Sequence, residues 1–293
     1  MVEPIKRVGI IVHPSRLEAM VLAQEVQEWL LERGIEVSFD EATAQKQNLV
    51  AFDTDAASLS SLDFMITLGG DGTILTAARR VAPYNIPILG VHLGKFGFIA
   101  EAHPDEIYSS LERVLRHEIA IEERLMIQAE IWRNGEQIAC RYGLNEVMVK
   151  SGMSHLVNLK TRLGGTPFAT YPADGVVVAT PTGSTAYALS AGGPIVMPTV
   201  QALLMVPICP HTLNARPLLL PSTEEIEIEI ESDGSDLLFA IDGIDPLMLQ
   251  SHDQIRIHRS EYITRLFVFA PGTFYRKVHS RYLYGERLNE WGR

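Results

Sequence analysis

The feature that most constrains the fold is a glycine-rich run between an apolar segment and a helical pattern. The apolar segment 64–68 leads into Gly69-Gly70-Asp71-Gly72-Thr73, and the residues that follow, 74–81, have helical spacing. A strand that enters a helix through such a turn is typical of phosphate sites, because free backbone N–H groups and the helix N-terminus face the anion. We expect the three glycines to supply positive φ angles and a close backbone approach.

One carboxylate lies within this run. Asp71 has the wrong charge for a phosphate ligand, so we expect it to hold a metal ion, to cap the helix, or to take a proton from a hydroxyl that attacks phosphorus. For an isolated Gly-Asp-Gly triplet, an ordinary turn with an N-cap explains the pattern equally well. The complete strand–GGDGT–helix unit favours the phosphate site.

The first hundred residues alternate between strand and helix patterns. Strands are predicted at 8–12, 35–39, 64–68 and 86–91, and helices at 15–33, 74–81 and 104–118. This order predicts a parallel, Rossmann-like α/β sheet, in which ligands bind at the carboxyl ends of the strands. The GGDGT run falls at such an end.

From about residue 102 to 265 the pattern changes to short strands and turns. Asn134-Gly135 is a hairpin signal, and segment 226–231 alternates strictly between Ile and Glu, which predicts a strand with a solvated acidic face. We expect 226–231 to pair with 237–241 across a turn at 233–234, and 254–259 to pair with 262–269. The prediction is a mainly antiparallel β domain at 102–265, after an α/β domain at 1–101 that segment 266–293 rejoins.

A second constellation lies at 174–194. Asp174 precedes an apolar strand that enters the hydroxyl-rich loop 180–185, and a short helix follows with Ser184 or Thr185 as its expected cap. Hydroxyls and free amides suit a nucleotide, and Tyr187 could stack on a base or donate to a phosphate, although a capped helix alone would explain the segment.

The pair Asn145-Glu146 precedes another apolar segment, 147–149. The amide of Asn145 could pair with an adenine edge, and the carboxylate of Glu146 could accept hydrogen bonds from ribose hydroxyls. A simple turn before the strand would explain both residues.

Charge and cysteine content exclude several classes of function. The net charge of -11 over 293 residues argues against a nucleic-acid or anionic-membrane binder. No apolar run approaches the roughly 18–20 residues of a membrane span. Cys140 and Cys209 lie far apart without the spacing of a metal site, which predicts buried free thiols. Free thiols, together with an N-terminal segment that has no apolar leader, predict a cytoplasmic protein. No HExxH or GxGxxG motif supports a zinc hydrolase or a dehydrogenase.

The order and spacing of these motifs resemble the NAD kinase family. The resemblance rests on GGDGT at 69–73, Asn145-Glu146, Asp174-Gly175, TPTGSTAY at 180–187 and SAGGP at 190–194, and the segments 94–98 and 211–217 extend it over nearly the whole chain. GGDGT alone is shared with lipid kinases and related phosphofructokinases. Segment 180–187 is what restricts the resemblance to the NAD kinase family. A lipid kinase and a non-catalytic NAD-sensing module are the alternatives.

The resemblance implies transfer of the terminal phosphoryl group of ATP, or of polyphosphate in some members, to the 2′-hydroxyl of the adenosine ribose of NAD, with a divalent cation such as Mg²⁺. It makes Asp71 the general base. The implied residues around the phosphate donor are Gly69, Gly70, Gly72 and Thr73. The implied NAD-binding residues are Asp71, Gly72, Asn145, Glu146, His155, Asp174, Thr185, Ala186, Tyr187 and Ser190.

Two departures from the family pattern concern the nicotinamide end of the dinucleotide. Pro172-Ala173 stand where many relatives carry a basic or polar residue, and Ile244 stands where an amide is often seen, so discrimination between NAD and NADH stays open. The resemblance also implies a homodimer or homotetramer with a shared site, to which the partner contributes Asp174. The apolar run 202–208 fits either such an interface or a buried core strand.

Overall fold

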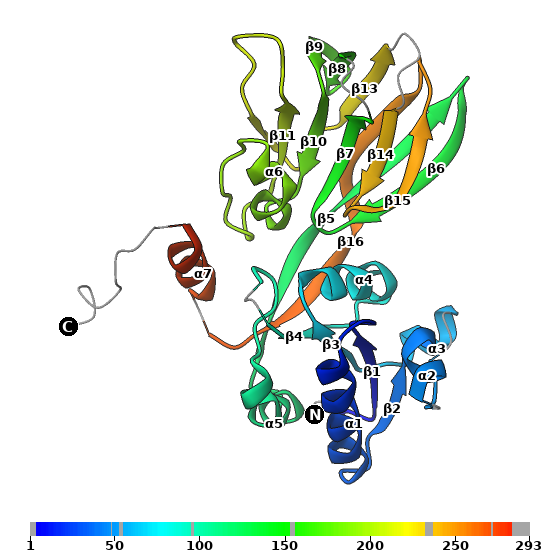
Figure 1. The fold of residues 1–293 in the computed structure, drawn as a ribbon, viewed down its shortest axis with the longest axis vertical. Coiled ribbons are helices and arrows are strands. Elements are labelled where there is room, and N and C mark those ends of the chain that lie inside the picture. The colour runs from blue at the N-terminus through cyan, green and yellow to red at the C-terminus, as the bar shows by residue number, and fades with distance from the viewer. Residues whose placement is uncertain are drawn as a thin grey trace, which may run out of the picture.

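The computed structural model describes residues 4–47, 49–52, 55–94, 97–152, 156–231, 237–270 and 272–282. Its first half contains β1 (Arg7–Val12), α1 (Leu17–Leu31), β2 (Glu36–Phe39), α2 (Glu41–Gln47), α3 (Ala56–Ser60), β3 (Phe64–Gly69), α4 (Asp71–Val81), η1 (Ala82–Tyr84), β4 (Ile88–His92), η2 (Pro104–Glu106) and α5 (Ile107–Leu115). Figure 1 shows this half below and a strand-rich half above.

The second half is built almost entirely from strands. It contains β5 (Ala120–Arg133), β6 (Glu136–Gly143), β7 (Glu146–Ser151), β8 (Val157–Leu163), β9 (Thr166–Ala173), β10 (Gly175–Ala179), η3 (Thr182–Thr185), α6 (Tyr187–Ser190), β11 (Ala202–Ile208), β12 (Leu218–Pro221), β13 (Ile226–Glu231), β14 (Leu237–Ile241), β15 (Ile244–Leu249), β16 (Gln254–Val268) and α7 (Thr273–Tyr282).

The predicted parallel sheet is confirmed in the first half. Strands β2, β1, β3 and β4 pair in parallel in that order. Apolar side chains of α1 and α5 cover one face of this sheet, and those of α3 and α4 cover the other. A parallel sheet with helices on both faces is buried on both sides, which explains why its strands are continuous apolar runs.

The second half is an antiparallel β-sandwich, as predicted, but its main sheet continues the parallel one. Strand β16 pairs in parallel with β4 at Leu266 and in antiparallel with β5 and β13, so one ten-stranded sheet crosses both halves. Figure 1 shows β5 and β16 running together from the lower half into the upper half. The second sheet, β12-β11-β10-β7-β14-β15, packs on it over a common apolar core.

Two predicted strand pairings are wrong. Segment 254–268 is the single strand β16, with an irregular register between Arg259 and Ile263, rather than a hairpin. Strand β13 pairs with β8 and β16, whereas β14 pairs with β7 and β15 in the other sheet. Periodicity identifies the buried face of a strand but not its neighbour. The turn expected at 233–234 lies outside the described residues.

The acidic face of β13 is solvated, as predicted. Its isoleucines are fully buried, while its glutamates lie half-exposed opposite basic residues of β8. Glu231 forms an ion pair with Lys160, and Glu227 lies 3.8 Å from Arg162.

The apolar run 202–208 is the core strand β11. Every residue of it is buried within this chain between β10 and β12. The run therefore gives no support to a subunit interface.

Candidate functional site

The GGDGT run joins β3 to α4, as the sequence predicts, but without positive φ angles. Gly70 has a φ of -113° and precedes the first residue of α4, and the described glycines with positive φ lie elsewhere. A Cβ on Gly69 would overlap the Thr73 hydroxyl, whereas Gly70 and Gly72 face open space. Close packing therefore explains Gly69, and access to the backbone explains the other two glycines.

A cavity of about 420 Å³ lies in front of the first turn of α4. Three of the four predicted donor residues line it, namely Gly70, Gly72 and Thr73. The guanidinium-bearing residues Arg16 and Arg80 also line it, together with an apolar wall of Ile11, Val12 and Pro14. Helix N-terminus and cations together favour an anionic ligand. The two arginines were not identified from the sequence, because no motif surrounds them.

The Asp71 carboxylate is held by backbone N–H groups of a distant segment. Its Oδ2 accepts from Phe98 N at 2.7 Å, and its Oδ1 accepts from Ile99 N at 3.2 Å and Ala100 N at 3.3 Å. A Cβ on Gly97 would overlap this carboxylate, so only glycine allows the approach. A carboxylate has about four acceptor positions, so roughly one remains for a further donor.

The turn at Asn145-Glu146 carries two buried oxygen atoms without a hydrogen-bond partner among the described residues. Asn145 and Glu146 are 7% and 8% exposed, and the atoms concerned are Asn145 Oδ1 and Glu146 Oε2. An unsatisfied buried polar atom costs stability, so such atoms need an explanation. A polar ligand at this turn would satisfy both.

The hydroxyl-rich loop packs directly on this turn. Thr180 N donates to Asn145 O at 2.8 Å, and Thr180 Oγ1 donates to Leu144 O at 2.6 Å. A Cβ on Gly183 would overlap the Asn145 carbonyl. The tertiary structure thus brings together two motifs that the sequence analysis named separately.

The expected helix cap is wrong. Ser184 is fully buried, donates to Pro181 O at 2.7 Å and accepts from Val196 N at 2.9 Å, and Thr185 Oγ1 donates to Thr182 O at 3.2 Å. Both hydroxyl groups therefore stabilise η3 by bonding to backbone groups, and Ser184 also binds the backbone at Val196. The helix that follows, α6, is a single turn without a side-chain cap.

The environment of Glu146 favours its protonated form. Burial, together with the charge of Asp242, raises the pKa of Glu146 to about 8, although a hydrogen bond from the Tyr187 N–H acts in the opposite direction. Tyr187 therefore lies against the Asn145-Glu146 turn, as a shared binding site requires.

Asp242 organises the same turn and was not predicted as a site residue. Its carboxylate accepts from the N–H groups of Leu144 at 2.9 Å, Asn145 at 2.8 Å and Glu146 at 3.1 Å. Burial raises the pKa of Asp242, and these hydrogen bonds oppose the rise. The Asp242-Gly243 pair, both with positive φ, was the available sequence signal.

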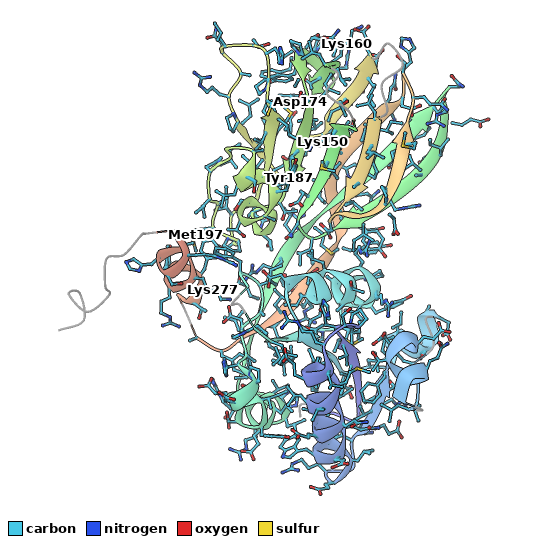
Figure 2. The ribbon with its side chains drawn as sticks, viewed as in Figure 1. Lys150, Lys160, Asp174, Tyr187, Met197 and Lys277 are labelled. Atoms are coloured by element: carbon cyan, nitrogen blue, oxygen red, sulfur yellow. The ribbon has the colours of Figure 1, made fainter. Side chains whose placement is uncertain are left out.

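Asp174 lies half-buried between β9 and β10, close to a lysine that the sequence analysis missed. The backbone of Asp174 accepts from Ser151 N at 2.8 Å and donates to Ile208 O at 3.1 Å. The Lys150 ammonium lies 6.0 Å from the ring centroid of Tyr187, and Figure 2 shows Lys150 between Asp174 and Tyr187. This edge of the site therefore carries one positive and one negative side chain.

The remaining predicted NAD-binding residues fall in the same region or outside the described chain. Thr185 and Ala186 are half-buried at the end of η3, and Ser190 is exposed at the end of α6. His155 lies outside the described residues.

Two buried basic residues lie at the junction of the two halves. Arg124 of β5 pairs with Glu122 at 2.7 Å and places Nη1 3.5 Å from Thr182 Oγ1. Lys277 of α7 pairs with Glu101 at 2.8 Å. Arg124 thus contacts the loop at 180–187, whereas Lys277 contacts the segment that holds Asp71.

Three further predictions concern metals, cysteines and membranes. No cluster of three His, Cys, Asp or Glu side chains suited to a metal ion is found among the described residues. Cys140 and Cys209 are free, as predicted, but both are exposed rather than buried. In the described part of the chain no helix is long and apolar enough to span a membrane.

Comparison with known proteins identifies two family domains and full-length relatives. The ATP-NAD kinase N-terminal domain matches residues 8–119 and the ATP-NAD kinase C-terminal domain matches residues 144–268. The NAD kinase of Syntrophotalea carbinolica is 36% identical over 96% of this chain and 100% of its own length. That of Koribacter versatilis is 38% identical over 96% of this chain and 99% of its own length.

Solved structures agree on the fold. Yeast NADH kinase in complex with NADH superposes with a TM-score of 0.90 at 26% identity, covering 97% of this chain and 89% of that one. An NAD kinase from Archaeoglobus fulgidus in complex with ATP gives a TM-score of 0.74 at 23% identity, covering 94% of this chain and 97% of that one.

Proposed function

Because this chain belongs to the NAD kinase family, we propose that it transfers the terminal phosphoryl group of ATP to the 2′-hydroxyl of the adenosine ribose of NAD, forming NADP. Family membership removes the lipid kinase alternative. The observation that carries the assignment of the site is the pair of buried oxygen atoms on Asn145 and Glu146, which have no hydrogen-bond partner among the residues that the structure describes and lie beside the loop at 180–187.

The dinucleotide side of the site is built on this turn. An Asn145 oxygen can accept from an adenine amino group, and a protonated Glu146 can both donate and accept hydrogen bonds with ribose hydroxyls. Tyr187 offers a ring for stacking, and the Lys150 ammonium offers a charge for the pyrophosphate. These roles account for why polar atoms are buried at this turn without hydrogen-bond partners in the described part of the chain.

The donor side of the site is the cavity before α4. Its backbone N–H groups and two arginines suit a chain of phosphates, and its apolar wall suits the base or ribose of a nucleotide. Polyphosphate has no group that would use the apolar wall. These features support ATP as the donor.

Asp71 is proposed as the general base for the attacking hydroxyl. Three N–H groups orient its carboxylate and leave about one acceptor position for the hydroxyl proton. Phosphoryl transfer through a loose transition state depends mainly on positioning and charge, so the orientation of Asp71 matters as much as its basicity.

A divalent cation, with Mg²⁺ as the expected ion, is part of the proposal. The described residues do not assemble a metal site made of protein ligands alone, and Mg²⁺ at kinase sites is commonly held by substrate phosphates with one or two carboxylates. Such an ion would neutralise charge on the donor phosphates.

One assay tests the function and the open choice of substrates. Purified protein is given NAD or NADH in combination with ATP or polyphosphate, and the formation of NADP or NADPH is followed. We expect turnover with ATP and a much lower rate with polyphosphate. NAD binding without turnover in any combination would instead identify a non-catalytic sensor.

We further propose a homodimer or homotetramer in the cytoplasm, with Asp174 contributed across the interface. Support comes from two exposed apolar side chains at opposite ends of the β8-β9 pair, Leu156 directly before β8 at 47% and Phe168 of β9 at 48% exposure. Mixing Asp71→Asn and Asp174→Ala proteins under subunit exchange should restore part of the activity, because some hybrid sites would hold both native residues. Hybrid oligomers without restored activity would place each site within one chain.

A further inference from the structure

The C-terminal helix α7 carries a buried lysine that faces the segment holding Asp71. Lys277 is 6% exposed, and its ammonium donates to Phe98 O at 3.0 Å, to Ala100 O at 2.8 Å and to Glu101 Oε1 at 2.8 Å. These three bonds match the three donors of an ammonium group. Figure 2 shows Lys277 pointing from α7 toward the junction of the two halves.

Segment 98–100 is thus held from two sides. Its carbonyl groups accept from Lys277, while its N–H groups donate to the Asp71 carboxylate. A peptide segment bonded in this way cannot shift without breaking bonds on both sides. The position of Lys277 therefore determines where the Asp71 oxygens find their donors.

A buried ammonium is a costly way to fill space. Burial lowers the pKa of Lys277, and the opposing charge of Glu101 compensates in part. An apolar side chain of similar length would fill the same volume without the cost of desolvation. What it could not supply is the set of hydrogen bonds to segment 98–101.

From this arrangement we propose that Lys277 is a positioning residue for phosphoryl transfer, acting on the Asp71 carboxylate through segment 98–101. The inference rests on the proposed function, in which Asp71 takes the proton of the attacking hydroxyl. Lys277 donates hydrogen bonds to segment 98–101, and that segment in turn holds the Asp71 carboxylate. We therefore expect its effect in the chemical step rather than in the binding of either substrate.

The test replaces the ammonium while keeping the length of the side chain. Lys277→Met removes the three hydrogen bonds, and Arg276→Met removes a positive charge from the neighbouring exposed position of the same helix as a control. We measure the single-turnover rate, KM for NAD and ATP, the melting temperature, and hydrogen exchange of the amides at 97–101.

For Lys277→Met we expect a single-turnover rate lowered by roughly 10- to 100-fold, in line with the effect of displacing a catalytic group by about 1 Å. Both KM values should stay within about threefold of wild type. Amide exchange at 98–100 should accelerate, and Arg276→Met should leave all readouts unchanged. Lys277→Arg, which keeps the charge and several donors, should recover part of the rate.

Wild-type rate and exchange in Lys277→Met would overturn the inference, as would a rise in both KM values that accounts for the whole loss. If Lys277→Met is too unstable to assay, Lys277→Gln replaces it, because the shorter, uncharged side chain stays polar but cannot keep the three hydrogen bonds of the ammonium group. A wild-type rate together with wild-type exchange in Lys277→Gln would then count against the proposal. If wild-type protein forms no NADP, the proposed function fails, while the exchange data still report whether Lys277 holds segment 98–100.

Discussion

Replacing Glu146 by Gln should remove a dependence of stability on pH that the fold imposes through this one carboxyl group. Burial and the charge of Asp242 raise the pKa of Glu146 from its ordinary value of 4.5 to about 8. In the unfolded chain the carboxyl group ionises near its ordinary pKa. In the folded protein it stays protonated over most of the pH range between the ordinary and the raised pKa. The folded state therefore binds one more proton than the unfolded state between these two values.

The direction and the size of the effect follow from proton linkage. Where the folded state binds one more proton, each pH unit of increase lowers the free energy of unfolding by about 1.4 kcal/mol. The contribution is absent well below the ordinary pKa and reaches its full size above the raised one. Between about pH 5 and pH 8, wild type should lose about 3 kcal/mol relative to Glu146→Gln, whose amide does not titrate in this range.

The assay is urea unfolding of ligand-free protein at four pH values over this interval. The measured quantity is the difference in unfolding free energy between wild type and variant, since this difference cancels the titration of all groups that do not interact with Glu146. Glu136→Gln, at an exposed position of β6, is the matched control and should give a constant difference. A difference for Glu146→Gln that stays within about 0.5 kcal/mol across the interval would mean that Glu146 is ionised in the folded protein, and the reasoning would be refuted.

Three further substitutions test the proposed roles of site residues. Asp71→Asn should lower kcat by roughly 10²- to 10⁴-fold with substrate binding mostly kept, and near-normal turnover would rule out the general base. Gly70→Val should raise KM for ATP more than KM for NAD. Gly70 lines the donor cavity and has an extended φ, so the new side chain should obstruct phosphate without straining the backbone. Equal losses for both substrates would indicate a misfolded turn. Asn145→Ala should weaken NAD binding by about 1–3 kcal/mol in calorimetry and leave ATP binding unchanged, and unaltered NAD affinity would make the turn purely structural.

Local sequence was sufficient for most individual elements. The alternation of residues 226–231 predicted β13 with its buried isoleucines, and the GGDGT run predicted the junction of β3 and α4. Asn134-Gly135 predicted a hairpin, and both residues have the positive φ angles of such a turn. Each of these patterns depends on neighbours within a few positions, so the chain itself contains the information.

Strand pairing was decided by the tertiary structure. Strand β13 has the pattern of any half-buried strand, and nothing in that pattern specifies β8 and β16 as its partners rather than β14. Likewise, the irregularity after Arg259 looked like a turn, but pairing with β5 on both sides of it keeps β16 in one piece. The partner of a strand depends on which distant segments bury the same core.

The site shows the same division between local pattern and long-range contact. The sequence by itself determined which segments carry the chemistry: GGDGT, Asn145-Glu146 and the loop at 180–187 all have residue types that bind phosphates or nucleotides. Only the tertiary structure showed that Asp242 holds the Asn145-Glu146 turn and that Lys277 holds the segment bonded to Asp71. The physical reason is that these bonds join side chains to backbone groups far away in the chain, and a backbone N–H or carbonyl has no signature in the sequence.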